Sequence, residues 1–414
     1  MKIVHKCSFC GSSEDDRKLL LEGPNGLYIC DRCTTICNTV VKNVSLMDNK
    51  DQNKDVLKPK DIVDILDDYV IGQDRAKRSL AVTVYNHYKK LELRNKDIQL
   101  SKSNLLLIGP TGVGKTYLLQ QIAKLLDVPF ISVDTTQLTP IGYKGQNLNE
   151  IWERLFRRVN NSVEDMQKAI IYFDEIDKLT RDDSGSGRNF YAQIQNELLK
   201  VIEDSELTFS VDNMHGMGTQ VTIDTSNMLF IFGGAFSDIV NIIEKRLGLS
   251  TKSAIGFGNE SNKIDKDKKN ELISKVNLDD IREFGLTPEF IGRISSVVTL
   301  DPLSVNDLIN ILTKPKNNVV SQFTQLFAVD GVNLIFDDEA LKYIAEKAYE
   351  KKTGARGLKS IIESSLVDAM YDIPSRKDIE SCIVTKEVIS DNKPVTLVKK
   401  TKRKNTKIKK LIVN

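Results

Sequence analysis

The sequence has no long hydrophobic run and little net charge. No apolar stretch among its 414 residues approaches the roughly 18 residues that a membrane-spanning helix needs, which excludes such a helix. The formal net charge is only +2, which excludes a chain that binds nucleic acid through its overall charge. The N-terminal stretch MKIVHKCSFC has no secretory hydrophobic region. We therefore expect a cytoplasmic protein without a membrane partner.

Cysteine is also scarce, with six in the whole chain. In a reducing compartment, so few cysteines argue against a disulfide scaffold and favour metal binding. Four of them form two C-x-x-C pairs, Cys7 with Cys10 and Cys30 with Cys33, separated by nineteen residues. Two such pairs can complete a tetrahedral thiolate site, so the spacing predicts a structural Zn²⁺ site. A module of about 40 residues buries too little core alone, so the metal would supply its folding energy.

The middle of the sequence alternates short apolar runs with helical patterns. The apolar runs are residues 104–109, 130–133, 169–173 and 227–232, and each is followed by turn or charged residues. Strands that are apolar on both faces belong to a parallel sheet covered by helices. The sequence after Gly114 places its leucines and isoleucine on one side of a helix. These patterns predict a three-layer α/β domain.

The segment GPTGVGKT follows one of these strands and opens a helix. It matches the phosphate-binding pattern G-x-x-x-x-G-K-[ST] in the context that this pattern requires. Backbone N–H groups of such a loop surround phosphate oxygens, so we expect Lys115 to reach the β- and γ-phosphates of ATP and Thr116 to bind Mg²⁺. The predicted nucleotide-binding residues here are Gly109, Pro110, Thr111, Gly112, Val113, Gly114, Lys115, Thr116 and Tyr117.

The segment AIIYFDEIDK, residues 169–178, supplies the expected acidic partners. Asp174 emerges at the carboxyl end of a buried strand, the edge at which open α/β sheets bind ligands. We expect Asp174 to belong to the Mg²⁺ site. Glu175 would polarise the attacking water as a general base.

The last part of the chain has a different pattern. Leu341, Ile344, Ala345 and Ala348 form a helical stripe that Asp337 or Asp338 could cap, which predicts a smaller, mainly helical domain. Further on, KKTKRKNTKIKK has eight Lys and Arg and no acid. Such a block is typical of a disordered, solvated tail, although it could also be a weak anchor for an acidic partner or nucleic acid. We expect Cys382 to be a core residue and Cys37 to be buried on a helix.

The predicted organisation therefore has five parts. They are a zinc-binding module (1–43), a linker (44–60), a large ATPase domain (61–303), a small helical domain (304–390) and a basic tail (391–414).

The order of these parts resembles that of the ClpX family of AAA+ protein unfoldases, from Cys7 to about residue 390. The stretches that carry the resemblance are CSFCG, YICDRC, DDYVIGQDRAK, AVTVYNHYK, LLLIGPTGVGKT, YFDEIDK, FGGAF, IGFG, TPEFIGR and KTGARGL. The resemblance implies an AAA+ ATPase that uses ATP, Mg²⁺ and Zn²⁺. It also implies a homohexamer that unfolds protein substrates, some brought by adaptors, and threads them into the ClpP peptidase.

The resemblance also implies roles for individual residues. Val70 and Ile71 correspond to the segment that packs against adenine. Arg293 corresponds to the arginine that enters the ATP site of the neighbouring subunit, a type of contact worth about 10³–10⁵ in rate. Arg356 corresponds to the small-domain arginine that senses nucleotide within its own chain.

Two loops have roles that only the resemblance implies. Gly142, Tyr143, Lys144 and Gly145 correspond to the axial-channel loop, in which the aromatic grips the translocating chain and the glycines let the loop swing. Ile255, Gly256 and Phe257 correspond to a docking loop that inserts into apolar clefts on ClpP, where six copies on one ring would gain by avidity.

The sequence departs from the family in the channel. Lys144 stands where valine is usual and would add one positive charge per subunit. The region 211–220 keeps one histidine but lacks the basic pair of the Arg-Lys-His loop at the channel entrance. Residues 181–200 follow the family pattern only in part.

Two other functions stay open from the sequence. A stand-alone remodelling chaperone would use the ATPase without a protease, but it would not need the loop at 255–257. A nucleic-acid remodelling AAA+ ATPase would use the zinc module and the tail as contacts, but residues 1–43 show no strong basic stripe. We therefore expect protein rather than nucleic acid as the substrate.

Overall fold

The computed structural model describes most of the chain. The described residues are 5–13, 19–23, 26–35, 37, 57–93, 103–139, 147–180, 188–203, 206–212, 218–249 and 271–400. The chain separates into two compact units, Met1–Val56 and Leu57–Asn414. None of the helices in the described ranges is long and apolar enough to cross a membrane.

The first unit is a small hairpin built around cysteines. Strands β1 (Leu20–Glu22) and β2 (Tyr28–Cys30) pair antiparallel, and a bridge between Lys6 and Ser13 closes the loop that carries the first cysteine pair. Its core consists of three buried cysteines and two partly buried apolar neighbours, namely Cys7, Cys30, Cys33, Leu20 and Ile29. So small a core contributes little free energy of folding by burial alone.

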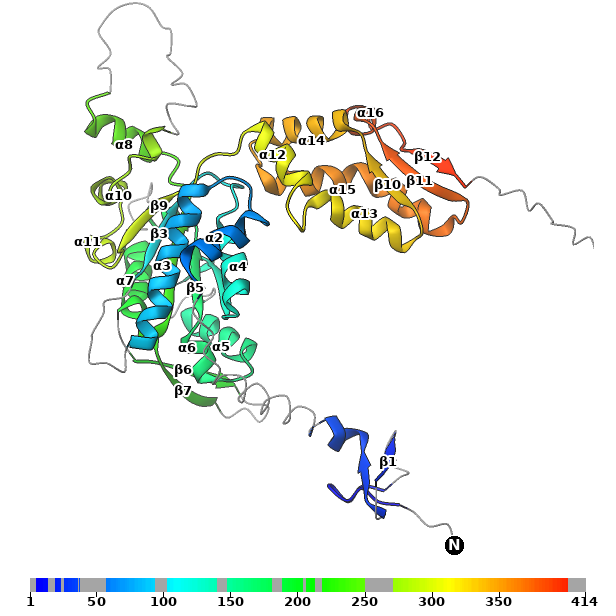
Figure 1. Ribbon diagram of the computed structural model, residues 1–414. Helices are drawn as coiled ribbons and strands as arrows, with labels where there is room; N and C mark the ends of the chain where they lie inside the picture. Colours follow the sequence, from blue (N-terminus) through cyan, green and yellow to red (C-terminus); the bar gives the residue numbers. More distant parts are fainter. Residues whose placement is uncertain are drawn as a thin grey trace, which may run out of the picture. The chain divides into compact units, whose positions relative to one another are not determined.

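The second unit contains a five-stranded sheet in which all neighbouring strands are parallel (Figure 1). In spatial order the strands are β4 (Phe130–Asp134), β5 (Ile170–Asp174), β8 (Leu229–Gly234), β3 (Leu105–Ile108) and β9 (Ser296–Thr299). The four predicted apolar runs form four of these strands. The sequence analysis did not predict β9, because Val298 is the one buried residue of this edge strand.

Helices cover both faces of the sheet, which confirms the predicted three-layer fold (Figure 1). One face packs against α2 (Pro59–Asp67), α3 (Asp74–Leu93) and α4 (Lys115–Leu126). Leu105 and Leu107 of β3 point into this core. The apolar side of α4 belongs to the same core, as its sequence pattern predicted.

The opposite face of the sheet contains Leu106 and Ile108 of β3. The elements that pack on it are α5 (Leu148–Arg158), α6 (Val163–Gln167), α7 (Arg188–Ile202), α8 (Ile239–Arg246), α10 (Leu278–Phe284) and α11 (Pro288–Ile291). Strands β6 (Glu206–Asp212) and β7 (Gly218–Asp224) form a separate antiparallel hairpin that the sequence analysis did not predict. The region expected at the channel entrance, 211–220, coincides with the tip of this hairpin, and 213–217 lie outside the described residues.

The small domain follows the large one along the chain. Its helices are α12 (Val305–Thr313), α13 (Val319–Val329), α14 (Asp338–Glu350), α15 (Ala355–Asp372) and α16 (Lys386–Ser390). The predicted stripe of Leu341, Ile344, Ala345 and Ala348 is buried in its core. Asp337 occupies the N-cap position of α14, although its side chain makes no capping hydrogen bond.

The small domain also has a three-stranded sheet. Strand β10 (Asn333–Phe336) pairs parallel with β11 (Ile379–Val384), which pairs antiparallel with β12 (Thr396–Lys399). Because β12 lies within residues 391–414, it corrects the predicted start of the tail: backbone pairing with β11 orders a segment whose composition alone looked like a solvated terminus. Cys382 on β11 is fully buried, as expected.

Two sets of contacts hold the segment between α2 and α3: Gln73 bonds to Asp301 at the end of the large domain, and Asp68 bonds to Lys316 of the small domain. The Gln73 amide donates to the Asp301 carbonyl at 2.7 Å and accepts from the Asp301 N–H at 2.8 Å. The Lys316 N–H donates to the Asp68 carbonyl at 2.9 Å, and its ammonium pairs with the Asp68 carboxylate at 2.6 Å. These contacts tie the segment before α3 to the start of the small domain.

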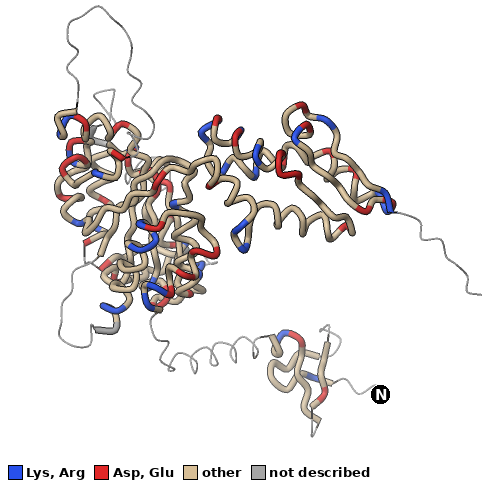
Figure 2. The backbone as a smooth tube through the Cα atoms, turned by 45° about the horizontal axis from the view of Figure 1, so that its top comes forward, with Lys and Arg blue, Asp and Glu red and all other residues tan. Residues whose placement is uncertain are grey.

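Charged residues of both signs are interspersed over the large and small domains (Figure 2). Several pairs link successive helical turns, such as Lys168 with Glu164 at 2.6 Å and Lys275 with Glu271 at 2.8 Å. Exposed pairs of this kind contribute about 0–1 kcal/mol each. The described surface is therefore an ordinary solvated one without a concentrated basic stripe.

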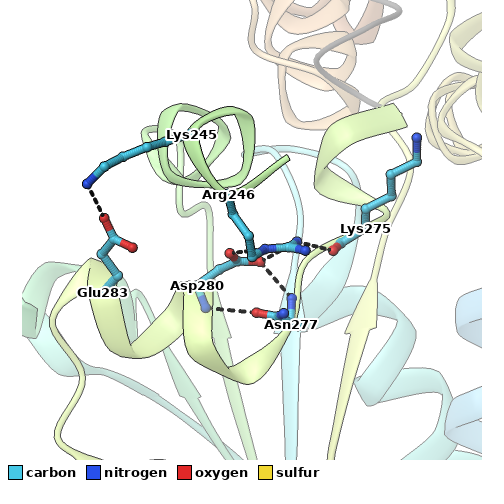
Figure 3. A network of polar contacts seen from close by, with 6 residues as sticks. All are labelled: Lys245, Arg246, Lys275, Asn277, Asp280 and Glu283. Atoms are coloured by element: carbon cyan, nitrogen blue, oxygen red, sulfur yellow. Dashed lines mark hydrogen bonds and ion pairs between the residues drawn. The ribbon is translucent and has the colours of Figure 1, made fainter. Parts of the chain in front are cut away.

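A denser polar network joins α8 to α10 (Figure 3). The Arg246 guanidinium donates to both carboxylate oxygens of Asp280, at 2.7 and 2.9 Å, and to the Lys275 carbonyl at 2.9 Å. Asp280 and Asn277 form a reciprocal capping box at the start of α10. Asp280 is 1% exposed, so the arginine and the cap together satisfy a buried carboxylate. The network joins the chain on both sides of residues 250–270.

Candidate functional site

The four predicted zinc ligands come together in the first unit. The Sγ atoms of Cys7, Cys10, Cys30 and Cys33 all lie within 4.8 Å of one another, with Cys10 and Cys30 at 3.6 Å. A tetrahedral site with Zn–S bonds of about 2.3 Å needs sulfurs about 3.8 Å apart. The geometry and the donor set therefore fit a closed, structural Zn²⁺ site.

The surroundings of the thiols differ. Hydrogen bonding to Ser12 lowers the pKa of the Cys10 thiol to about 6, whereas burial raises the pKa of the Cys33 thiol to about 12. Zinc binds thiolates, so a bound ion would stabilise the charged form even of the buried ligand. Metal affinity is thereby linked to the folding of this unit.

Removal of the metal is expected to unfold the first unit. In the full chain, a Cys30→Ser substitution or excess chelator should make the first 56 residues rapidly sensitive to limited proteolysis, because zinc binding to small modules supplies about 10–16 kcal/mol. ATP hydrolysis by the second unit should persist in the Cys30→Ser chain, which is assayed with Mg²⁺ and without chelator. The matched control is Cys37→Ser, which leaves the four ligands intact. Equal protease resistance with and without metal would contradict a structural zinc site.

The phosphate-binding loop lies between β3 and α4. Gly112 and Gly114 have φ of 82° and 96°, a conformation that favours glycine. Gly112 is required for a second reason besides its positive φ: a Cβ there would lie 2.4 Å from the Thr353 carbonyl oxygen of the small domain. The Ala355 N–H, at the start of α15, donates to the Gly112 carbonyl at 3.0 Å. The loop is therefore in direct backbone contact with the small domain.

Lys115 is the first residue of α4 and is buried. Its ammonium donates to the carbonyls of Gly109, at 2.6 Å, and Pro110, at 3.2 Å. Burial lowers the pKa of Lys115, and the carboxylates of Asp174 and Asp177 act in the opposite direction. A buried ammonium held only by carbonyls is well suited to bind the phosphate oxygens of a nucleotide.

Thr116 and Asp174 form the expected metal pair. The Thr116 hydroxyl donates to Asp174 Oδ2 at 3.2 Å, although 58 residues separate them in sequence. A hydroxyl next to a carboxylate at the edge of the sheet fits Mg²⁺, which takes few protein ligands and shares the rest with water and phosphates. These two residues would hold the ion.

Glu175 follows β5 with φ of 60°, an unusual conformation for a residue with a side chain. Partial burial raises the pKa of Glu175, and the carboxylates of Asp134 and Asp174 raise it further. A raised pKa makes this carboxylate a stronger base, as general-base catalysis requires.

Val70 and Ile71 also line the site. The sequence analysis missed the residue that hydrogen-bonds to the backbone of Val70. Lys77 of α3 is 2% exposed, and its ammonium donates to the Val70 carbonyl at 2.5 Å and to Asp67 at 2.6 Å. The only available signal was its place in the segment DDYVIGQDRAK. Lys77 holds the backbone against which adenine would pack.

The two predicted arginines differ in position. Arg356 is the second residue of α15 and lines the site, where its charge acts on Lys115. Arg293 does not line it: its side chain is 53% exposed and pairs with Glu203 at 2.6 Å. An exposed arginine outside the site of its own chain is available to a neighbouring chain.

These residues surround one cavity of about 620 Å³ between the large and small domains. Of the predicted nucleotide residues, Val70, Ile71, Thr111, Gly112, Val113, Gly114, Lys115, Thr116, Tyr117, Asp174, Glu175 and Arg356 line it. Gly109 and Pro110 do not line the cavity, but their carbonyls accept hydrogen bonds from the Lys115 ammonium, which does. The predicted channel residues Gly142, Tyr143, Lys144 and Gly145 and the docking residues Ile255, Gly256 and Phe257 lie outside the described residues.

Three protein-family models match the zinc-binding unit, the large domain and the small domain of this chain. Residues 100–297 match the AAA domain (Cdc48 subfamily), residues 5–43 match the ClpX C4-type zinc finger, and residues 303–387 match the C-terminal, D2-small domain of ClpB protein. The ATP-dependent Clp protease ATP-binding subunit ClpX of Treponema denticola is 41% identical over 404 residues, which cover 94% of this chain and 95% of that relative. The chain belongs to the ClpX family.

Membership of the ClpX family confirms the predicted fold class and chemistry. The chain is an AAA+ ATPase of a family of protein unfoldases, with ATP and Mg²⁺ as cofactors of the large domain and Zn²⁺ as that of the N-terminal module. The ClpX zinc-finger match covers all four cysteines, and the AAA match covers the phosphate loop and the acidic pair after β5.

Proposed function

We propose that this chain works in a homohexamer that unfolds protein substrates and delivers them to the ClpP peptidase. The relative from T. denticola is named as the ATP-binding subunit of a Clp protease. The observation that supports the proposal most directly is the cavity shared by the large and small domains. A site formed by two domains can convert nucleotide turnover into domain movement.

The chemistry follows from the residues of the cavity. Lys115 binds the β- and γ-phosphates, and Thr116 with Asp174 holds Mg²⁺, which neutralises phosphate charge when bound. Glu175 takes the proton of the attacking water. The site lies at the carboxyl edge of β5, so the strand holds the acidic pair rigidly.

Domain coupling passes through the contact between Gly112 and the start of α15. The Ala355 N–H donates to the Gly112 carbonyl. A movement of the phosphate loop would therefore move the start of α15, the helix that carries Arg356. The Gln73–Asp301 and Lys316–Asp68 contacts form the other side of this hinge. Hydrolysis would then rotate the small domain against the large one.

The exposed position of Arg293 supports a ring. An arginine that completes the neighbour's site requires head-to-tail contacts, and such contacts form a ring when the rotation between subunits closes. Arg293 would release Glu203 and stabilise the charge on the transferred phosphoryl group. In such a ring Tyr143 grips the substrate, Lys144 adds positive charge to the channel, and Ile255 and Phe257 dock on ClpP.

The test uses a stably folded fluorescent protein that carries a degradation tag, with ATP and with or without ClpP. Loss of fluorescence without ClpP would establish unfolding, and fragments that appear only with ClpP would establish delivery. Unfolding without any binding of ClpP would instead support the stand-alone chaperone. Fluorescence that persists under ATP turnover would contradict the proposal.

The network of Figure 3 yields a prediction about docking, since it joins the ends of the segment that contains Ile255 and Phe257. The Arg246→Ala substitution should remove the charged partner of the buried Asp280 carboxylate and leave it the Asn277 N–H of the capping box, which weakens the contact between α8 and α10. The helices at the base of the docking loop should then loosen. We expect ClpP affinity to fall more than tenfold, since 1.4 kcal/mol already changes an affinity tenfold.

The matched control is Lys245→Ala, which breaks a pair between the same two helices. Its partner is Glu283, and the two side chains are 74% and 51% exposed, so little stability should be lost. ClpP affinity is measured by the ClpP concentration that gives half-maximal peptide cleavage, and ATP turnover without ClpP serves as the test of folding. Equal ClpP affinity for both variants would contradict a role of the network in docking.

A further inference from the structure

The side chain that orients the metal-binding carboxylate is a buried tyrosine. Tyr172 lies on β5 two residues before Asp174, and alternate residues of a strand point to the same face. Its side chain is fully buried, and its hydroxyl donates to Asp174 Oδ1 at 2.9 Å.

The neighbouring strand is shaped to admit this hydroxyl. A Cβ on Gly233 of β8 would lie 2.0 Å from the Tyr172 hydroxyl oxygen and 2.6 Å from two ring carbons. Glycine at this position therefore leaves the space that the phenol needs to reach the end of its own strand. The contact depends on two adjacent strands, β5 and β8, whose pairing is parallel.

The two oxygens of Asp174 have different partners. Oδ1 accepts from the Tyr172 hydroxyl and from the Glu175 N–H, at 2.9 and 3.0 Å. Oδ2 accepts from the Thr116 hydroxyl at 3.2 Å. The first oxygen is thus held by one donor on β5 and one just after it, and the second faces Thr116, the residue that would share the metal.

We infer that Tyr172 is a positioning residue for the Mg²⁺ site. Its hydroxyl, together with the Glu175 N–H, holds Asp174 so that Oδ2 is turned toward the metal beside Thr116. Without the hydroxyl, Oδ1 of Asp174 keeps only the Glu175 N–H as a donor, and the carboxylate can rotate, for example toward the ammonium of Lys115, which its charge already influences. Loss of a hydrogen bond to a metal ligand typically costs 10–100-fold in metal affinity.

The test is Tyr172→Phe in the full-length chain, which removes one hydroxyl and keeps the ring. Binding of a fluorescent ADP analogue is titrated at rising Mg²⁺ concentration, and again with chelator. We expect the Mg²⁺ midpoint to rise about tenfold while the metal-free affinity for the analogue stays unchanged. This readout needs no hydrolysis.

The matched control is Tyr88→Phe. Tyr88 is partly buried and its hydroxyl donates to the Lys168 carbonyl at 3.0 Å, but it does not line the cavity. The control should keep the wild-type Mg²⁺ midpoint. The inference would be overturned by an unchanged midpoint in Tyr172→Phe or by an equal loss of affinity with and without metal. A Tyr172→Phe chain that failed to fold would also overturn it, because the hydroxyl would then serve the sheet rather than the metal.

Discussion

Glu175→Gln is expected to reduce ATP turnover by about 10²–10⁴ while ATP binding is kept, because a positioned general base contributes that much to the rate. Glutamine has nearly the same shape but cannot accept the proton of the attacking water. The Glu175 side chain has no part in the hydrogen bond between Thr116 and Asp174, so the metal pair should be undisturbed. Turnover is measured by phosphate release, and binding by a fluorescent ATP analogue.

The pH dependence of turnover tests the same role. The base must be deprotonated to act, and partial burial with the carboxylates of Asp134 and Asp174 raises its pKa above the ordinary 4.5. Turnover at saturating ATP should therefore fall, as the pH is lowered, at a higher pH than an ordinary carboxyl would produce. The residual activity of Glu175→Gln should lack this step.

Glu203→Gln is a suitable control, since it changes a carboxylate outside the cavity that pairs with Arg293. It should retain the acid limb of the pH profile. A Glu175→Gln chain with near-normal turnover would show that another group accepts the proton.

Tyr143→Ala is expected to abolish unfolding almost completely while ATP hydrolysis continues. In the proposed function the aromatic side chain transmits the force of hydrolysis to the substrate, and alanine offers the substrate almost no contact area. A large aromatic ring buries 150–250 Å² by typical values, so about 4–6 kcal/mol of apolar contact per subunit would be lost at most. Unfolding is followed by the fluorescence of the tagged protein.

Tyr143→Phe is the matched variant, because it keeps the ring and loses only the hydroxyl. It should unfold substrates at close to the wild-type rate. If an assembled Tyr143→Ala ring unfolded its substrates at full speed, the channel role of this residue would be wrong, although the ATPase chemistry would still hold.

Much of the site was predictable because its signals are local in the sequence. The C-x-x-C pairs have the spacing that zinc requires, and the loop ending in Lys115 and Thr116 carries its own glycines, strand and helix. Asp174 was predictable because a buried apolar run precedes it. Each of these signals lies within a few positions of the sequence, although the zinc site and the metal pair each bring together two such segments.

Other elements were not predictable, because they are ordered by strands that are distant in the sequence. The edge strand β9 has one buried residue, and β12 sits in a basic segment, so their order comes from pairing with β3 and β11. Burial patterns that depend on a distant strand leave no periodicity of their own. The hairpin of β6 and β7 was missed as well, although Leu207, Phe209 and Val211 alternate with exposed residues along β6.

The sequence by itself determined the zinc ligands, the phosphate loop, the acidic pair and the parallel sheet that presents them. Only the tertiary structure showed that Gly112 lies against the backbone of Thr353, that Lys77 holds the Val70 carbonyl, and that Gly233 admits the hydroxyl of Tyr172. These contacts join residues from different elements, some more than 200 positions apart. They form because folding brings distant backbone into van der Waals and hydrogen-bonding range, and no local pattern records which segments will meet.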